Sequence, residues 1–329
     1  MDVISLAERA GRLPRMPLGT FPTPLTRPRR LEAALRSGRL VVKRDDLTGF
    51  AVAGNKTRPL EFLIGEARRR GAEVLVTGGG PGSNFCPAAA LAARAAGLEC
   101  ELVVWGNPVS ANLALAAAAG ARLRPTGDGD REAVDTLVRL RAGELAAAGR
   151  RSYAVPRGGS TELGAVGFAL AAAELATQLT GLKEPVRLIV VPVGSGGSCA
   201  GLLAGMTALG LRIPVLGVTV SRPPEQISRQ IRELAEGCAR LLGTPPPATE
   251  AEVHDARGPG FGRATSTERC RARLALQTEG MFFDETYGAE TLSAAIDRLN
   301  GGTGPVLLWH TGGLVPAIGA IHAIPEDAS

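Results

Sequence analysis

The sequence predicts an α/β fold in which two domains hold parallel-type twisted sheets flanked by helices. Short apolar segments alternate with helix-like segments along nearly the whole chain, which is the pattern of parallel strands joined by crossover helices. Apolar residues make up 45% of the chain and aromatic residues only 4%, so the core would consist mainly of Ala, Leu and Val. A chain of 329 residues also suits two domains better than one.

The first half of the chain contains four short apolar segments that are predicted to be strands. These strands cover residues 40–43, 73–77, 100–105 and 122–123. The helices predicted around them have apolar residues at helical spacing or are rich in alanine. They cover residues 55–70, 84–96, 111–119 and 131–148.

The same alternation continues in the second half of the chain. Strands are predicted at residues 186–193, 215–220 and 305–309. The first of these has so few polar residues that both of its faces should be buried in a parallel sheet. Helices are predicted at residues 161–179, 197–209, from Pro223-Pro224 onward, 266–279 and 290–299, and residues 258–262 are expected to form a loop.

Three glycine-rich turns directly follow predicted strands, at residues 77–80, 193–196 and 310–313. Ligand sites in parallel sheets lie at the carboxyl ends of strands, so these turns are candidate binding positions. Residues 52–160 are predicted to form a smaller domain, inserted into a larger one. The larger domain would consist of residues 1–51 and 161–329, and the cleft between the two domains is the expected ligand site.

Composition argues against several functional classes. The net charge of +5 comes from scattered arginines without interleaved aromatic residues, so no nucleic-acid partner is expected. The five cysteines include no CxxC pair and the three histidines have no metal-ligand spacing, so no metal site is expected. No signal peptide and no run of about 18 apolar residues is visible. The prediction is a cytoplasmic protein without a membrane partner.

Lys56 stands out because it follows Gly54-Asn55 at the start of a predicted helix. The helix dipole disfavours a cation there and lowers its pKa, and an amine near neutrality is what imine chemistry with an aldehyde requires. An ordinary surface lysine is the plain alternative, although this chain has few lysines. Residues 49–57 also approach the P-loop pattern GxxxxGK[ST], but Asn55 is one residue too many and no strong strand precedes them.

A second motif, Gly194-Ser195-Gly196-Gly197-Ser198, follows an apolar strand and opens a helix. Its backbone N–H groups, the helix N-terminus and the serine hydroxyls could hold a phosphate. The alternative is a turn that only lets helix and strand pack closely. A dinucleotide-binding fingerprint is excluded because Cys199 stands where the third glycine should be. The turn at residues 79–84 similarly precedes a helix, which Ser83 or Asn84 could cap.

Taken together, the motifs resemble the fold-type II pyridoxal-phosphate enzymes of the tryptophan synthase β type. Within these, the chain resembles a divergent member of the D-cysteine desulfhydrase and 1-aminocyclopropane-1-carboxylate deaminase family. The matching segments extend over nearly the whole chain in order and spacing. They are residues 21–25, 43–49, 54–58, 82–84, 194–197, 258–260, 279–281, Tyr287 and 310–313.

The resemblance implies that pyridoxal 5'-phosphate is the cofactor. Lys56 would form the internal aldimine, Asn84 would hydrogen-bond the ring hydroxyl, and residues 194–198 would hold the phosphate. Tyr287 would stack near the ring and Thr311 would face the pyridine nitrogen. A neutral hydroxyl there would keep that nitrogen unprotonated, which suits elimination at Cβ more than transamination.

For catalysis the resemblance implies Lys56, Ser83 and Tyr287, with Lys56 moving protons at Cα and Ser83 helping to hold the substrate carboxylate. The expected reaction is β-elimination or deamination of a small amino acid, with cysteine desulfhydration as the default. The alternatives are a cysteine synthase-like β-replacement and a non-catalytic protein that binds the cofactor. The resemblance also implies a homodimer.

Two positions on the substrate side depart from the family pattern. Phe85 replaces a residue that is usually His or Gln, and Phe261 replaces a tyrosine whose hydroxyl is thought to act on the substrate. Phe261 keeps the ring but cannot transfer a proton. After Tyr287 the family's Thr-Gly-Lys is replaced by residues 288–290. The nearby Cys86 is either a new substrate contact or, as we expect, a buried structural residue.

Overall fold

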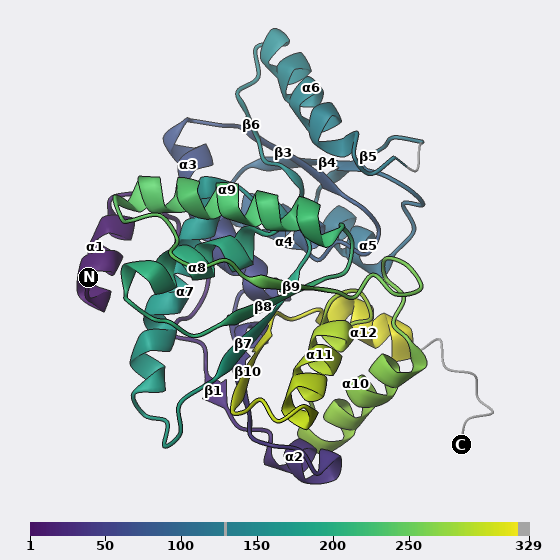
Figure 1. Cartoon of the computed structure of the whole chain (residues 1–329). Helices are drawn as coiled ribbons and strands as arrows, with labels where there is room; N and C mark the ends of the chain where they lie inside the picture. Colours follow the sequence, from purple (N-terminus) through teal and green to yellow (C-terminus); the bar gives the residue numbers. More distant parts are fainter. Residues whose placement is uncertain (128–129, 322–329) are drawn as a thin grey trace, which may run out of the picture.

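The computed structural model describes residues 1–127 and 130–321, which form two β-sheets surrounded by helices (Figure 1). A six-stranded sheet has the order β1-β2-β10-β7-β8-β9. Its strands are β1 (Leu25–Thr26), β2 (Leu40–Arg44), β7 (Leu188–Val193), β8 (Val215–Thr219), β9 (Glu252–Asp255) and β10 (Val306–His310). All neighbours in this sheet are parallel except β1 and β2.

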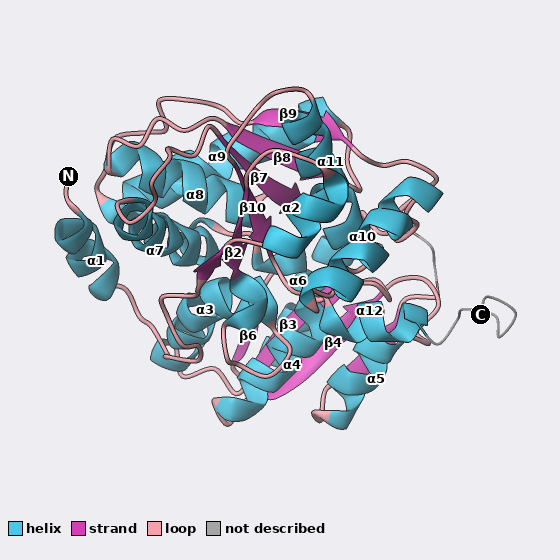
Figure 2. Ribbon diagram, turned by 90° about the horizontal axis from the view of Figure 1, so that it is seen from below, coloured by secondary structure: helices cyan, strands magenta, loops and turns pink. Residues whose placement is uncertain are grey.

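Helices cover both faces of the six-stranded sheet (Figure 2). Along β7, Ile189 and Val191 pack with α7 (Glu162–Leu179), α8 (Gly197–Ala208) and α9 (Pro224–Leu242). The alternate residues Leu188 and Val190 pack on the other face with α2 (Arg29–Leu35), α10 (Ser266–Glu279) and α11 (Gly288–Asn300). Burial of both faces explains why this strand is almost free of polar residues.

A second, four-stranded sheet has the order β5-β4-β3-β6, and all of its strands are parallel. The strands are β3 (Val74–Gly79), β4 (Glu99–Val104), β5 (Arg122–Pro125) and β6 (Ser152–Ala154). Helices α3 (Thr57–Arg69), α4 (Phe85–Ala95) and α5 (Ala111–Ala118) contribute to the core on one face. Helix α6 (Val134–Ala147) packs on the other face, at the top of Figure 1.

Most predicted elements are present, with ends that shift by a few residues. One shift bears on the site, because the predicted helix at residues 55–70 begins as a 3-10 turn, Gly54–Lys56, and becomes α-helical only at Thr57. The prediction missed six elements: α1 (Val3–Gly11), β1, α2, β6, β9 and α12 (Leu314–Ile321). Four of these are very short strands or one- to two-turn helices, and α12 contains Pro316, which weakens the helical signal.

Candidate active site

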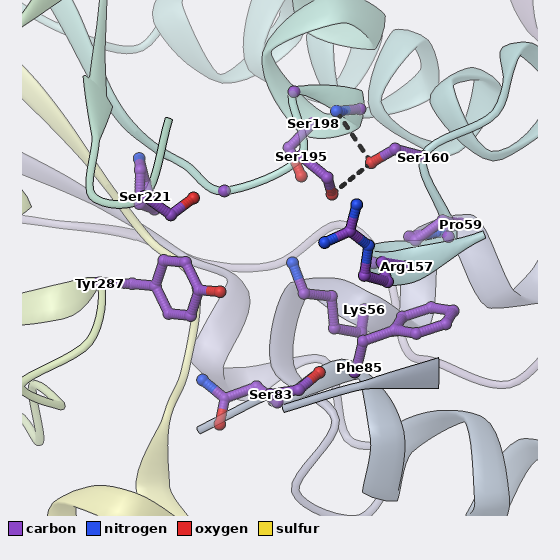
Figure 3. A pocket seen from close by; sticks show the side chains of 18 of the residues that line it. Lys56, Pro59, Ser83, Phe85, Arg157, Ser160, Ser195, Ser198, Ser221 and Tyr287 are labelled. Carbon is purple, nitrogen blue, oxygen red and sulfur yellow. Dashed lines mark hydrogen bonds between the residues drawn. The ribbon is translucent and has the colours of Figure 1, made fainter. Parts of the chain in front are cut away.

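One cavity opens where strands of the two sheets end, and all ten predicted site residues line it (Figure 3). Gly80 follows β3, Gly194 follows β7, Ser221 follows β8 and Thr311 follows β10, so the cavity lies at the carboxyl ends of these strands. This is the expected position for a ligand in parallel sheets. The ten residues are Lys56, Ser83, Asn84, Gly194, Ser195, Gly196, Gly197, Ser198, Tyr287 and Thr311.

The loop that carries Lys56 is attached to two other parts of the cavity. The backbone N–H of Asn55 donates to the carbonyl of Thr311 at 3.0 Å, and its side-chain amide donates to Ser198 Oγ at 3.1 Å. Gly54 has a φ of +54°, and a Cβ there would collide with the Thr311 carbonyl, so glycine is required at this position. These contacts hold Lys56 beside the glycine-serine turn although about 140 residues separate them in sequence.

The amine of Lys56 points into the cavity (Figure 3). Burial lowers its pKa to about 8, and the nearby carboxylate of Asp284 partly opposes this shift. The sequence predicted a lowered pKa but attributed it to the helix dipole. Lys56 lies at the N-cap of α3, and desolvation is the largest cause of the shift. An amine with this pKa is substantially neutral at mildly alkaline pH.

The turn at residues 194–198 forms a cradle of hydrogen-bond donors at the start of α8. Gly196 has a φ of +85°, and this left-handed turn directs the chain into the helix that begins at Gly197. The hydroxyls of Ser160 and Ser195 lie 2.6 Å apart, and the N–H of Gly197 donates to Ser160 Oγ at 3.2 Å. Hydroxyls and helix N-terminal N–H groups together make an anion-binding site.

Ser160 was not predicted from the sequence as part of the cradle. It lies just before α7, and the fold brings it next to the turn at residues 194–198. The only sequence signal was the short run Gly158-Gly159-Ser160, where both glycines have positive φ. That run follows β6, which was itself too short to predict.

Asn84 lies at the N-cap position of α4, but its side chain makes no capping hydrogen bond. Its Oδ1 accepts from Asn112 Nδ2 at 3.0 Å, and its Nδ2 approaches Asp284 Oδ2 at 3.5 Å. The predicted capping role of this side chain is therefore wrong. Instead, the two neighbours orient the amide at the edge of the cavity, where Ser83 lies below Lys56 in Figure 3.

Asp284 is a second residue that sequence reasoning missed. It is 1% exposed, and its Oδ1 accepts the N–H of Gly288 at 2.9 Å. Burial raises its pKa to about 6, although this hydrogen bond and the one from Asn84 favour the charged form. Gly313 leaves the space that Asp284 occupies, because a Cβ there would lie 2.7 Å from the Asp284 carboxyl. Such a buried carboxyl beside a lysine is a feature of functional sites.

Aromatic rings form a wall of the cavity beside the cradle. Tyr287 packs against Gly194, where a Cβ would lie 3.0 Å from the Tyr287 ring. Phe261 meets Tyr287 edge to face with ring centroids 6.0 Å apart. Phe85 is almost fully buried under the cavity against Gly159. Cys86 is also buried, as expected, and burial raises its thiol pKa to about 11, so it is not a reactive thiolate.

Comparisons with known proteins agree on one family. The family model described as "Pyridoxal-phosphate dependent enzyme" matches residues 16–312. Nocardicin C-9' epimerase of Nocardia uniformis subsp. tsuyamanensis is 35% identical, over 96% of this chain and 98% of the relative. D-cysteine desulfhydrase of Klebsiella pneumoniae (strain 342) is 34% identical, over 94% of this chain and 97% of the relative.

Among solved structures, an ACC deaminase homologue superposes with a TM-score of 0.89. It is 30% identical and covers 95% of each chain. The predicted fold class, parallel-type sheets flanked by helices as in the fold-type II enzymes, is confirmed by this match and by the sheet topology.

Proposed function

Since this chain belongs to the family of pyridoxal-phosphate dependent enzymes, we propose that it is a lyase or deaminase that acts on a small amino acid. Its cofactor is pyridoxal 5'-phosphate. The observation that carries the proposal is one cavity that holds both a neutralisable lysine amine and an anion cradle. Lys56 supplies the amine, and the loop before it is bonded to the cradle through Asn55 and Ser198.

The shape of the cradle fits the phosphate group of this cofactor. A Cβ on Gly197 would lie 2.8 Å from Ser160 Oγ, and one on Gly194 would press on Tyr287. Any side chain at these positions would therefore fill the space in front of the helix α8 N-terminus, which is where an anion binds. The residues that would hold the cofactor are Lys56, Asn84, residues 194–198, Tyr287 and Thr311.

When bound, the cofactor supplies an electron sink that stabilises negative charge at Cα of an amino acid. Lys56 is suited to remove and return the Cα proton because its pKa is lowered to about 8. Ser83 and the N-terminus of α4 would hold the substrate carboxylate. Phe261 has no hydroxyl beside Tyr287, so Tyr287 supplies the phenol group on that wall.

The default reaction is elimination of a Cβ substituent, which would yield ammonia and a 2-oxo acid. One relative is named a D-cysteine desulfhydrase. Cysteine is therefore the first substrate to test, and desulfhydration is the first reaction to test. β-Replacement and non-catalytic cofactor binding remain the alternatives. Another relative is named an epimerase, so inversion of configuration at Cα is a further alternative reaction. Inversion requires proton transfer on both faces of Cα. The positions of Lys56 and Tyr287, on two sides of the cavity, are compatible with this requirement.

The test begins with the cofactor. The purified protein should absorb at about 410–430 nm, the range of a lysine-bound cofactor, and should lose this band with borohydride or in Lys56→Ala. A colourless protein that cannot be reconstituted would overturn the proposal. With the band present, D- and L-cysteine, serine, O-acetylserine and the cyclopropane amino acid are screened for 2-oxo acid and for inversion. Phe261→Tyr should raise desulfhydration if Phe261 separates this protein from its relatives.

We also propose a homodimer, a cytoplasmic location and the division into residues 52–160 and the remainder. The resemblance supports the homodimer. Among the described residues, no helix is both long and apolar enough to cross a bilayer. The four-stranded sheet lies between Val74 and Ala154, which supports the domain division. Light scattering of the purified protein tests the dimer, with a monomeric mass as the contrary result.

A further inference from the structure

Three arginines line the cavity in addition to the residues of the cofactor site. Arg131 precedes α6, Arg157 lies in the 3-10 turn after β6, and Arg222 follows β8. Two carboxylates accompany them, Glu132 and Asp135. The group therefore holds three positive and two negative charges.

The carboxylates are already paired with two of the arginines. Arg157 Nε contacts Asp135 at 3.0 Å, and its Nη2 contacts Glu132 at 3.1 Å. Arg131 Nε lies 3.2 Å from the other Glu132 oxygen. Glu132 thus links the two arginines, Asp135 pairs with Arg157, and neither carboxylate forms a salt bridge with Arg222.

Arg222 makes no salt bridge among the described residues, and Glu132 and Asp135 attract it only from a longer distance. It is 7% exposed, and its side chain makes one hydrogen bond there, from Nη1 to the carbonyl of Gly194 at 2.9 Å. Burial, followed by the charge of Arg157, lowers its pKa. A buried guanidinium is costly unless it is paired, so an anion bound in front of Arg222 would relieve this cost.

The position of Arg222 favours an anion other than the cofactor phosphate. In the cradle, the Gly197 N–H and the Ser160 hydroxyl lie at the N-terminus of α8, whereas Arg222 bonds to the carbonyl of Gly194, at the strand end of the same turn. Arg131 lies over the ring of Phe261, 5.7 Å from its centroid. Burial and then the charge of Asp284 raise the pKa of Tyr287, whereas the charges of Arg131 and Arg222 lower it. Because both cations act on Tyr287, they lie near the aromatic wall.

We propose that Arg222, with Arg131 and Arg157, binds a second anionic group, namely a carboxylate at the far end of the substrate side chain. The substrate class is then an amino acid with an acidic side-chain substituent. Trp105 and Phe261 line the same cavity and provide apolar contacts for the methylene groups between the two carboxylates. This inference rests on the proposed function, since it assigns the substrate of that same site.

The experiment compares two probes that differ in charge but hardly in shape, S-carboxymethylcysteine and S-carbamoylmethylcysteine, each as both enantiomers. The holoenzyme is titrated with each probe, and the concentration for half-maximal change of the cofactor band is measured. The carboxylate probe should act at a concentration lower by roughly 10-fold or more, because hydrogen bonds to charged groups are strong. Equal concentrations for the two probes would overturn the inference.

Variants then assign the preference to the arginines. Arg222→Gln and Arg131→Gln should each reduce the preference for the carboxylate probe several-fold without weakening cofactor binding. If Arg222→Gln does not fold, the result for Arg131→Gln alone decides whether the arginines cause the preference for the carboxylate probe. The control is Arg68→Gln, on the exposed end of α3, which should keep the full preference. Weaker cofactor binding with an unchanged preference would assign the arginines to the phosphate and reject the substrate role.

Failure of this inference is distinct from failure of the proposed function. If the cofactor band is absent or responds to no amino acid, the proposed function fails. If the band responds to both probes equally, the proposed function stands and only the assignment of an acidic substrate is rejected.

Discussion

At the scale of single residues, burial decides the chemistry of the site more than sequence neighbours do. Lys56 and Asp284 are both buried and interact electrostatically, and burial lowers the pKa of the amine and raises that of the carboxyl. The two values approach each other, to about 8 and about 6. Groups with such values can exchange protons with a substrate near neutral pH.

The pKa of Lys56 predicts how fast the cofactor enters the apoprotein. Only the neutral amine attacks an aldehyde, so the rate of reconstitution should rise about fivefold between pH 7 and 8 and level off above about pH 9. The growth of the cofactor absorption band over this pH range measures it. In Asp284→Asn the midpoint should move to lower pH, because the carboxylate that raises the Lys56 pKa is removed. A rate still rising steeply above pH 10 would contradict the lowered pKa.

Glu290 predicts a pH dependence of stability. It is 4% exposed, its Oε2 has no hydrogen-bond partner in the described structure, and burial raises its pKa to about 8. Between about pH 4.5 and 8 the folded state keeps a proton that the unfolded chain releases, so stability falls as pH rises through this window. Glu290→Gln keeps the neutral form and should be more stable than the parent at pH 8 by about 1–3 kcal/mol.

Urea unfolding of this variant and the parent at pH 5.5 and pH 8 measures the effect. The exposed Glu233 on α9 offers a control, since Glu233→Gln should change the free energy of unfolding little at either pH. A difference between Glu290→Gln and the parent that does not grow with pH would refute the assignment.

At the scale of elements, the anion cradle is a product of strand, turn and helix. Strand β7 ends at Val193, Gly196 turns the chain with a positive φ, and α8 begins at Gly197, whose N–H donates to Ser160 Oγ in the cradle. Gly197 is helical, so its lack of a side chain is not needed for the backbone. The space it leaves for Ser160 is what requires glycine there.

Gly197→Ala is therefore expected to weaken cofactor binding by about 10-fold or more, because its methyl group would displace Ser160 from the cradle. The dissociation constant of the cofactor, measured by its absorbance, tests this. Gly143 in α6 is a matched control, since a Cβ there meets nothing within 4 Å. Gly143→Ala should leave cofactor binding unchanged and stabilise the helix by about 0.5–1 kcal/mol. Equal cofactor affinity in both variants would disprove the role of this glycine.

At the scale of the whole molecule, a buried ionic network joins the element that carries Lys56 to the six-stranded sheet. Arg58 on α3 makes two hydrogen bonds of 2.7 Å to Asp45, which follows β2, and bonds of 2.8 and 3.0 Å to Glu174 on α7. Trp309 of β10 donates to Asp45, and Lys43 of β2 donates to Glu174. The network fixes α3, and with it the loop of Lys56, relative to β2, β10 and α7.

Removing Arg58 leaves the buried carboxylate of Asp45 without its cationic partner, and leaves the partly buried Glu174 with Lys43 alone. Arg58→Leu should lower the free energy of unfolding by about 3–5 kcal/mol, as measured by urea denaturation. Arg240→Leu is the control, because its partner Glu162 and Arg240 itself are 48% and 66% exposed. An exposed pair is worth less than about 1 kcal/mol. Similar losses in the two variants would show that the buried network does not hold the molecule together.

The sequence alone determined the alternation of strands and helices, the family, the cofactor and ten of the residues that line the cavity. These follow from local patterns, because apolar periodicity reports burial and the motifs around Lys56 and Gly194 carry their chemistry in neighbouring residues. The short elements β6 and β9 were missed because three or four residues give no usable period.

Only the tertiary structure decided which distant groups meet. Asp284 near Lys56, Ser160 in the cradle and Arg222 at the Gly194 carbonyl come from segments without a motif of their own. The cause of the Lys56 pKa shift was likewise decided by the fold, because desolvation depends on what surrounds a side chain in space. The stretch Gly54–Arg58 illustrates both parts of this comparison. Its lysine was recognisable in the sequence, whereas the structural role of its arginine depends on three other elements of the chain.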